Sequence, residues 1–130
     1  MQGTKHQFEE LSGAIIGAAI SVHRVLGAGY QESVYANALS AALTERGIPH
    51  LREHEVDLYY HDVHVGKHRL DLLVDDKIVV ELKAVDKVLE LHKAQLRSYL
   101  RSTNKEVGLL LNFDAPVVDV RRAVHTTTPK

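Results

Sequence analysis

Apolar residues recur with two different periods along this chain of 130 residues. In the first third they return every three or four residues, which is typical of helices with one buried face. Helices are therefore predicted over residues 9–26 and about 31–46, each followed by a segment that contains glycine. Further along, the period changes to two, which predicts strands over 55–60 and 63–74 with a turn at 61–62.

The remaining pattern predicts a β-hairpin followed by a crossover connection. Residues 75–77 have turn chemistry, so the strand that ends at Val74 is followed by another that begins at Ile78. A third helix then has the length needed to lay the next strand parallel to a neighbour. The predicted fold class is α/β, an α+β sandwich of order ααβββαββ with a mixed central sheet flanked by helices. The last three elements are expected at residues 86–101 (helix), 106–113 (buried strand) and 117–124 (weaker strand).

Length and composition limit what the protein can be. The chain fits a single domain over residues 1–130, with a core at about 8–125. The formal net charge of −1 provides no overall positive field, so any contact with nucleic acid must come from local patches. The chain has no cysteine, which suits the cytoplasm. The first helix is too short and too polar to span a bilayer, so we expect a cytoplasmic protein without a membrane partner.

Three charged residues interrupt the apolar hairpin: Asp71, Glu81 and Lys83. If the turn comprises residues 75–77, Asp71 falls opposite Glu81 with their β-carbons about 5 Å apart, and Lys83 shares that face. Like charges at that distance are destabilising unless a cation lies between them, and a hard divalent cation with oxygen ligands is the natural candidate. The alternative is an exposed, solvated pair of acids beside a turn. The apolar run favours the metal site, because it is typical of strands buried on both faces.

Other polar residues allow more than one interpretation. Glu32 begins the second predicted helix, where an acid favours the helix dipole, and Tyr35 lies on the same face. In the third predicted helix, Gln95 and Tyr99 flank the apolar stripe on one side, and a basic series on the other side is either a phosphate-binding edge or a solvated face. Two histidines that share a strand face, His64 and His68, invite a zinc hypothesis, but scattered surface imidazoles are the favoured account.

The element order, with Asp71 and Glu81-x-Lys83, resembles the core of the PD-(D/E)xK nuclease superfamily. The segment LGAGYQESVY contains Gly29-x-x-Glu32-x-x-Tyr35, so the chain is similar to the GxxExxY family of small bacterial and archaeal proteins. The segments RLDLLV, VVELKAV, AQLRSYL and VGLLLNF agree with that family over about residues 8 to 125. The resemblance implies a restriction-endonuclease-like core.

The resemblance also implies roles for particular residues. Asp71, Glu81 and the backbone carbonyl of Leu82 would ligate Mg²⁺ or Mn²⁺, and Lys83 would face the reacting phosphate. Glu32 matches the acidic residue that many members place on the helix before the sheet, which adds it to the catalytic candidates. Gln95 and Tyr99 resemble the Gln-x-x-x-Tyr pair of RecB-type exonucleases. The candidate substrate-binding residues are Gln95, Tyr99, Tyr35 and Lys87.

Two functions from different classes follow. The first is a divalent-metal-dependent nuclease that hydrolyses phosphodiester bonds of DNA or RNA. The second is a nuclease-fold protein that binds or self-assembles as a homo-oligomer, with weak or no catalysis. The second hypothesis draws on the small size of the chain, its near-neutral charge and its lack of a dense basic patch.

Overall fold

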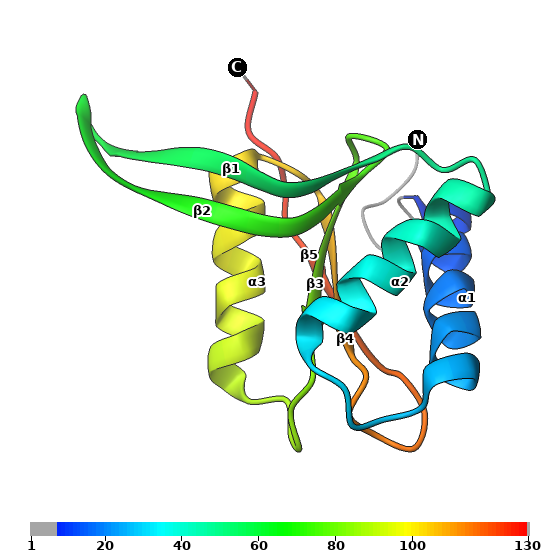
Figure 1. The fold of residues 1–130 in the computed structure, drawn as a ribbon. Helices are drawn as coiled ribbons and strands as arrows, with labels where there is room; N and C mark the ends of the chain where they lie inside the picture. Colours follow the sequence, from blue (N-terminus) through cyan, green and yellow to red (C-terminus); the bar gives the residue numbers. More distant parts are fainter. Residues whose placement is uncertain (1–7, 130) are drawn as a thin grey trace.

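The computed structural model describes residues 8–129, which form three helices and five strands (Figure 1). In chain order the elements are α1 (Glu9–Leu26), α2 (Glu32–Glu45), β1 (His50–Tyr60), β2 (Val63–Val74), β3 (Ile78–Lys83), α3 (Glu90–Thr103), β4 (Val107–Asn112) and β5 (Asp119–Val124). This order is the one that the apolar periods predict.

The five strands form one mixed sheet in the order β1-β2-β3-β4-β5. The pairing of β3 with β4 is parallel, and the other pairings are antiparallel. Parallel strands run in the same direction, so the chain must return to the starting end of the sheet before β4 begins. The crossover through α3 makes this return. Val74 pairs with Ile78, which confirms the predicted register of the hairpin. The α/β fold class is therefore confirmed.

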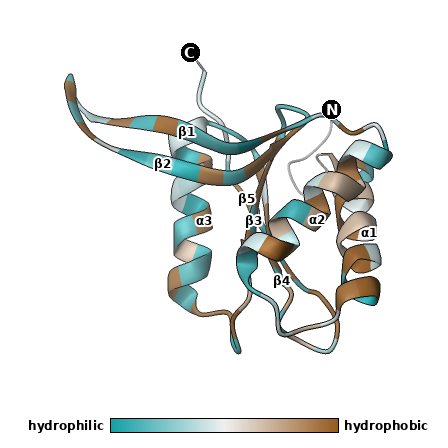
Figure 2. Cartoon of the chain, in the orientation of Figure 1, coloured by the Kyte–Doolittle hydropathy of each residue, from teal (hydrophilic) through white to brown (hydrophobic). Residues whose placement is uncertain are grey.

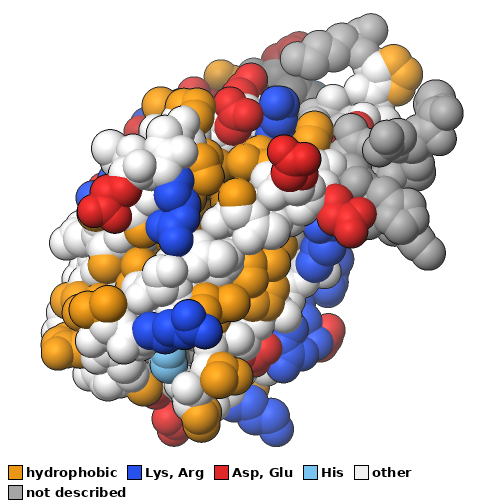
Figure 3. Space-filling view, turned by 90° about the vertical axis from the view of Figure 1, so that its right-hand side faces the viewer, with side chains coloured by type: hydrophobic (Ala, Val, Ile, Leu, Met, Phe, Trp, Pro, Cys, Tyr) orange, Lys and Arg blue, Asp and Glu red, His pale blue; other side chains and the backbone are white. Residues whose placement is uncertain are grey.

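Two apolar clusters lie on opposite faces of the sheet. Helices α1 and α2 cover one face and α3 covers the other, as Figure 1 shows. The central strands β3 and β4 are buried on both faces, and in Figure 2 they are largely apolar. On the side of the molecule formed by α1 and α2, apolar side chains lie exposed among charged ones (Figure 3). Val25 of α1 is one of the exposed apolar residues of the protein.

Two predicted boundaries differ most from the structure. Strand β1 begins at His50 instead of residue 55, because its polar side chains are solvated while its backbone pairs with β2. Helix α3 begins at Glu90 instead of residue 86, because Leu89 has an extended backbone (φ −99°, ψ 162°) that caps the helix.

The segment after β5 is held by hydrogen bonds. It has no regular secondary structure, but Thr128 exchanges two hydrogen bonds with the side chain of Asn104, at 2.9 and 3.0 Å. A third bond joins the His125 N–H to the Glu106 carbonyl at 2.8 Å. These bonds anchor the segment as far as Thr128.

The β1–β2 hairpin forms an arm that projects beyond the rest of the sheet (Figure 1). Strands β1 and β2 pair along almost their whole length, whereas β2 pairs with β3 only from Leu72 to Val74. The arm therefore leaves the sheet near Asp71. Within residues 8–129, none of the helices combines the length and apolar character needed to cross a membrane.

The packing of α3 on the sheet generates a stability prediction at Gly108. A β-carbon at this position would lie 2.8 Å from Leu96 Cδ1 and 3.2 Å from Leu100 Cδ2, and both leucines are buried. Gly108→Ala is therefore expected to destabilise the fold by about 1–3 kcal/mol through overpacking. Denaturant unfolding measures this change.

The matched control is Gly13→Ala in α1, where an added β-carbon meets nothing within 4 Å. Alanine favours the helix over glycine by about 0.5–1 kcal/mol, so this variant is expected to be more stable than wild type. Equal effects of the two substitutions would contradict the packing of α3 on β4.

Candidate metal and phosphodiester site

The candidate site lies where β2 and β3 separate. Their paired residues end at Leu72 and Val80, and the next residues are Asp71 and Glu81. Each carboxylate then accepts a hydrogen bond from the backbone of the opposite strand. Glu81 Oε2 accepts from the N–H of Asp71 at 2.9 Å, and Asp71 Oδ2 accepts from the N–H of Leu82 at 2.8 Å. Side-chain oxygens thus replace the missing backbone partners, and the two acids are held together.

A backbone distortion accompanies this separation. Arg52 pairs with Leu72 and His54 pairs with Leu70, but Glu53 between them has a left-handed backbone with φ 50°. Leu70 and Leu72 then pack in different apolar clusters, although residues two apart in a regular strand share a face. The side-chain alternation of β2 is therefore broken at Asp71.

Glu81 is the more costly of the two acids to ionise. Only 4% of its surface is exposed, and its pKa is raised to about 8. Burial is the largest cause and the negative charges of Asp71 and Glu32 add to it, while the Asp71 N–H and the Lys83 ammonium oppose the shift. Burial also raises the pKa of Asp71, against the hydrogen bond from Leu82 and the charge of Lys83. The pair therefore resists carrying two negative charges without a cation.

Glu32 lies in the first turn of α2 and lines one groove together with Asp71. Burial raises its pKa, Lys83 lowers it, and the charge of Asp71 raises it. The fold therefore brings together Glu32, Asp71, Glu81 and Lys83 from two strands and a helix.

Lys83 ends β3 and connects the acids to α3. Its Nζ makes a long hydrogen bond of 3.5 Å to Gln95 Oε1, which places the Gln95 amide of α3 beside the ammonium. Tyr99, one turn further along α3, is buried, and its ring lies edge-on to His68 with centroids 4.4 Å apart. Burial raises the pKa of Tyr99 to about 12, and the charges of Glu81 and Asp71 add to the shift. The phenol therefore stays protonated and can donate a hydrogen bond.

The other two candidate substrate-binding residues have different settings. Tyr35 is fully buried, stacks on Phe113 with centroids 4.6 Å apart, and donates its hydroxyl to the Gly27 carbonyl at 2.6 Å. Its ring supports the turn between α1 and α2, and the structure does not bring it to the acids. Lys87 is exposed in the connection between β3 and α3.

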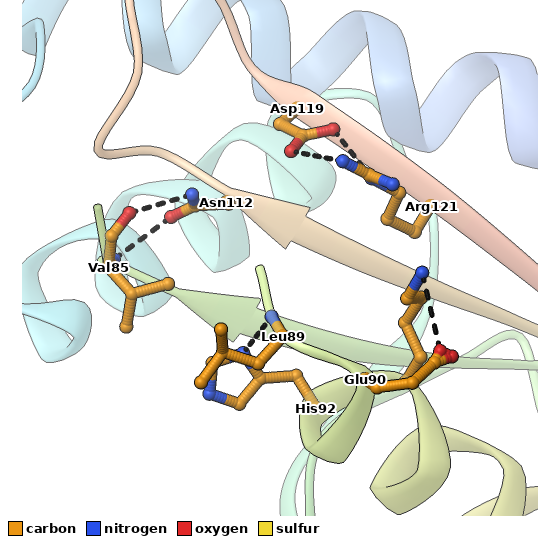
Figure 4. Close-up of polar contacts among 8 residues, drawn as sticks. Val85, Leu89, Glu90, His92, Asn112, Asp119 and Arg121 are labelled. Atoms are coloured by element: carbon orange, nitrogen blue, oxygen red, sulfur yellow. Dashed lines mark hydrogen bonds and ion pairs between the residues drawn. The ribbon is translucent and has the colours of Figure 1, made fainter. Parts of the chain in front are cut away.

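Asn112 fixes this connection, and sequence reasoning missed it. It is 2% exposed at the end of β4, where it is paired in register with Lys83. Its side-chain amide accepts from the Val85 N–H at 3.0 Å and donates to the Val85 carbonyl at 2.8 Å (Figure 4). The signal in the sequence is a polar residue at the end of an otherwise apolar strand.

His68 was predicted to be a surface imidazole, and the structure gives it a partner on α3. Its Nδ1 lies 2.9 Å from Ser102 Oγ, so it joins the arm to α3 beside Tyr99. His64 instead lies 3.0 Å from Asp57 Oδ1 on the arm. The two histidines thus have different partners.

The donor set fits a hard divalent cation held by few protein ligands. Within residues 8–129, no three His, Cys, Asp or Glu side chains converge into a ready-made metal site. Mg²⁺, however, keeps several waters and takes as few as one or two carboxylates. Each of the crossed hydrogen bonds engages one carboxylate oxygen, and the second oxygen of each group can serve as a ligand. Burial and the neighbouring acids raise the pKa of Glu81, and a bound cation would favour its ionised form.

The mixed sheet, covered by helices on both faces and with acids where two strands separate, defines a restriction-endonuclease-like core. A family model described as the PD-(D/E)XK nuclease superfamily matches residues 9–123. The chain therefore belongs to the PD-(D/E)XK nuclease superfamily. Membership of the narrower GxxExxY family stays a prediction.

Among solved structures, the crystal structure of SSO0001 is similar to this chain, with a TM-score of 0.57 and 22% sequence identity. The similarity covers 96% of this chain and 63% of that protein, and at this identity it shows the fold alone. A search of curated proteins found no match.

The raised pKa of Glu81 predicts how stability depends on pH. Because the folded-state pKa is about 8 and the ordinary value is 4.5, folding stability falls as pH rises through this window. Glu81→Gln removes the titration and keeps an oxygen acceptor for Asp71. Without divalent metal, this variant is expected to be more stable than wild type above pH 8, by a few kcal/mol at about 1.4 kcal/mol per pKa unit. The difference should vanish near pH 4.5.

Urea unfolding across this pH range, in chelator, measures the effect. Glu45→Gln, which changes an exposed acid in the last turn of α2, serves as the control and should follow the wild-type pH dependence. Parallel curves for wild type and Glu81→Gln would contradict the described environment of Glu81.

Asn112→Ala is expected to destabilise the fold by about 2 kcal/mol or more, because it leaves two backbone groups of Val85 without their partner. The matched control is Asn104→Gly, which removes a similar pair of bonds to Thr128 in an exposed setting and suits the left-handed backbone (φ 53°). That variant should lose less than about 1 kcal/mol. Equal losses in thermal or urea unfolding would contradict a clamp by Asn112.

Proposed function

We propose that this chain is a divalent-metal-dependent nuclease that hydrolyses phosphodiester bonds of DNA or RNA. The observation that carries the proposal is the crossed pair of carboxylates, Asp71 and Glu81, held against each other beside Lys83. Neutral oxygen acceptors could satisfy the same two backbone N–H groups, so folding alone does not require two acids beside an ammonium. Membership of the nuclease superfamily supports the proposal.

In the proposed function, Asp71, Glu81 and the backbone carbonyl of Leu82 hold Mg²⁺ or Mn²⁺. When bound, the ion polarises the phosphate and lowers the pKa of a water. The two acids contribute the negative charge that retains the ion. Their hydrogen bonds to the backbone fix the direction of each carboxylate before substrate arrives.

The other residues act on the phosphate itself. Lys83 provides a fixed positive charge where the phosphodiester gains negative charge in the transition state. Gln95 orients that ammonium from α3. Tyr99 is protonated at neutral pH, where its pKa of about 12 lies far above the pH, and it donates a hydrogen bond to a phosphate oxygen. The raised pKa of Glu32 brings its carboxyl closer to the range in which it exchanges a proton. Lys87 would bind a phosphate further along the strand.

A second candidate function is self-assembly on the nuclease fold. The arm carries four exposed apolar side chains, and Figure 2 shows apolar patches along this hairpin. These residues are Tyr59, Tyr60, Val63 and Val65, with exposures of 60–67%. Exposed apolar side chains gathered on a projecting hairpin favour contact with another chain.

Metal-dependent cleavage tests the first proposal. Purified wild-type protein is expected to cleave at least one of single- or double-stranded DNA or RNA with Mn²⁺ or Mg²⁺ and to stop in chelator. Asp71→Ala, Glu81→Ala and Lys83→Ala should each lower the rate by about 100-fold or more, since each removes charge at the reacting phosphate. Saturating metal should raise the melting temperature of wild type by a few degrees, and Asp71→Ala should lose this shift.

The control variants are Glu90→Ala and Lys93→Ala, which change an acid and an ammonium that pair with each other on α3 at 3.6 Å. Both should cleave like wild type. Equal cleavage by all variants would identify a contaminating nuclease. If no variant cleaves and ultracentrifugation shows an oligomer, the self-assembly function replaces the nuclease.

A further inference from the structure

A groove of about 380 Å³ leads from the surface to Asp71, between the start of α2 and strands β1 and β2. It is lined by Glu32, Ser33, Ala36, Arg52, Glu53, Arg69 and Asp71. We propose that Arg52 and Arg69 bind phosphate groups of one nucleic-acid strand beside the cleavage site. This inference rests on the proposed function and identifies where the substrate backbone enters.

Of the two arginines, Arg52 has a neutral hydrogen-bond partner and Arg69 has an acidic one. Arg52 is exposed on β1, pairs in register with Leu72, and so lies beside the position of Asp71. Its Nη2 donates to Asn37 Oδ1 of α2 at 2.7 Å. An amide is neutral, so this bond fixes the guanidinium against α2 without neutralising its charge, and within residues 8–129 no ion pair of Arg52 with an acid is found. The remaining guanidinium donors suit the bidentate recognition of a phosphate.

Arg69 lies two residues before Asp71 on β2, and its charge lowers the pKa of that acid. Its Nη2 donates to Glu53 Oε1, and both side chains are largely exposed. Glu53 occupies the distorted position of β1 with φ 50°, which sets the acid against Arg69. An exposed ion pair of this kind is worth little, so a phosphate can displace the Glu53 carboxylate.

The charge balance explains why a nuclease of this composition needs such a site. The chain carries a net charge of −1, so no general field attracts nucleic acid. The groove also contains the acids Glu32, Glu53 and Asp71, which repel phosphate. Two guanidinium groups in the same groove offset that repulsion near the acids that would hold the metal. The alternative is purely structural, with Arg52 bracing α2 and Arg69 only neutralising Glu53.

Anisotropy titration of labelled single- and double-stranded oligonucleotides distinguishes these roles. The full chain is titrated in Ca²⁺ over a range of salt, with gels to confirm that the oligonucleotide stays intact. Arg52→Ala and Arg69→Ala are each expected to weaken binding about 5- to 10-fold and to reduce the slope of log affinity against log salt by about 1. Arg52→Lys should retain part of the affinity, because it retains the charge. Glu53→Gln should strengthen binding.

The matched control is Arg121→Ala, another exposed arginine that is ion-paired with an acid, Asp119, on β5 (Figure 4). It should leave affinity and salt slope unchanged, and unfolding curves verify that every variant is folded. If wild type binds and cleaves but the groove variants match it, the inference is overturned and the nuclease stands. If Arg121→Ala weakens binding equally, the groove is not the site. If wild type binds no oligonucleotide and cleaves none, both proposals fail.

Discussion

The structure depends on a constraint at the point where β2 leaves β3. Two backbone N–H groups lose their strand partners there, and the carboxylates of Asp71 and Glu81 accept from them. This arrangement satisfies the backbone but brings like charges together in a poorly solvated place, as the raised pKa of Glu81 records. In the proposed function, this electrostatic cost prepares the two carboxylates before any ligand binds.

The crossover connection determines what surrounds the acids. Because β3 and β4 are parallel, the chain must return to the starting end of the sheet between them. Helix α3 makes that return on the face opposite to α1 and α2. It carries Gln95 and Tyr99 back past the end of β3, where Gln95 meets Lys83. Asn112 then holds the first part of the connection through Val85. The topology therefore supplies residues from three elements to one end of the sheet, with little irregular backbone between them.

Elements buried on one or both faces could be predicted from the sequence, because burial imposes a period on the apolar residues. The hairpin register also followed from turn chemistry, and with it the approach of Asp71 to Glu81. The start of β1 could not be predicted, since an edge strand is defined by backbone pairing that its side chains do not record. Tyr35 was expected in the cleft, but its hydroxyl is taken by Gly27. Helical spacing identifies a face and not the neighbour that covers it.

The groove arginines and Asn112 were missed for a related reason. Their partners are far away in the sequence or on other elements, so no local spacing marks them.

The independence of the β1–β2 arm has a consequence for how such proteins can diverge. The acids are fixed by pairing that begins at Leu72, on the body side of the separation. The turn at His61 and Asp62 lies at the far end of the antiparallel β1–β2 pairing. Adding one residue to each strand at this turn would lengthen the projection and leave every earlier pair in place. The length of the arm can therefore change in evolution without disturbing Asp71 and Glu81 at its base.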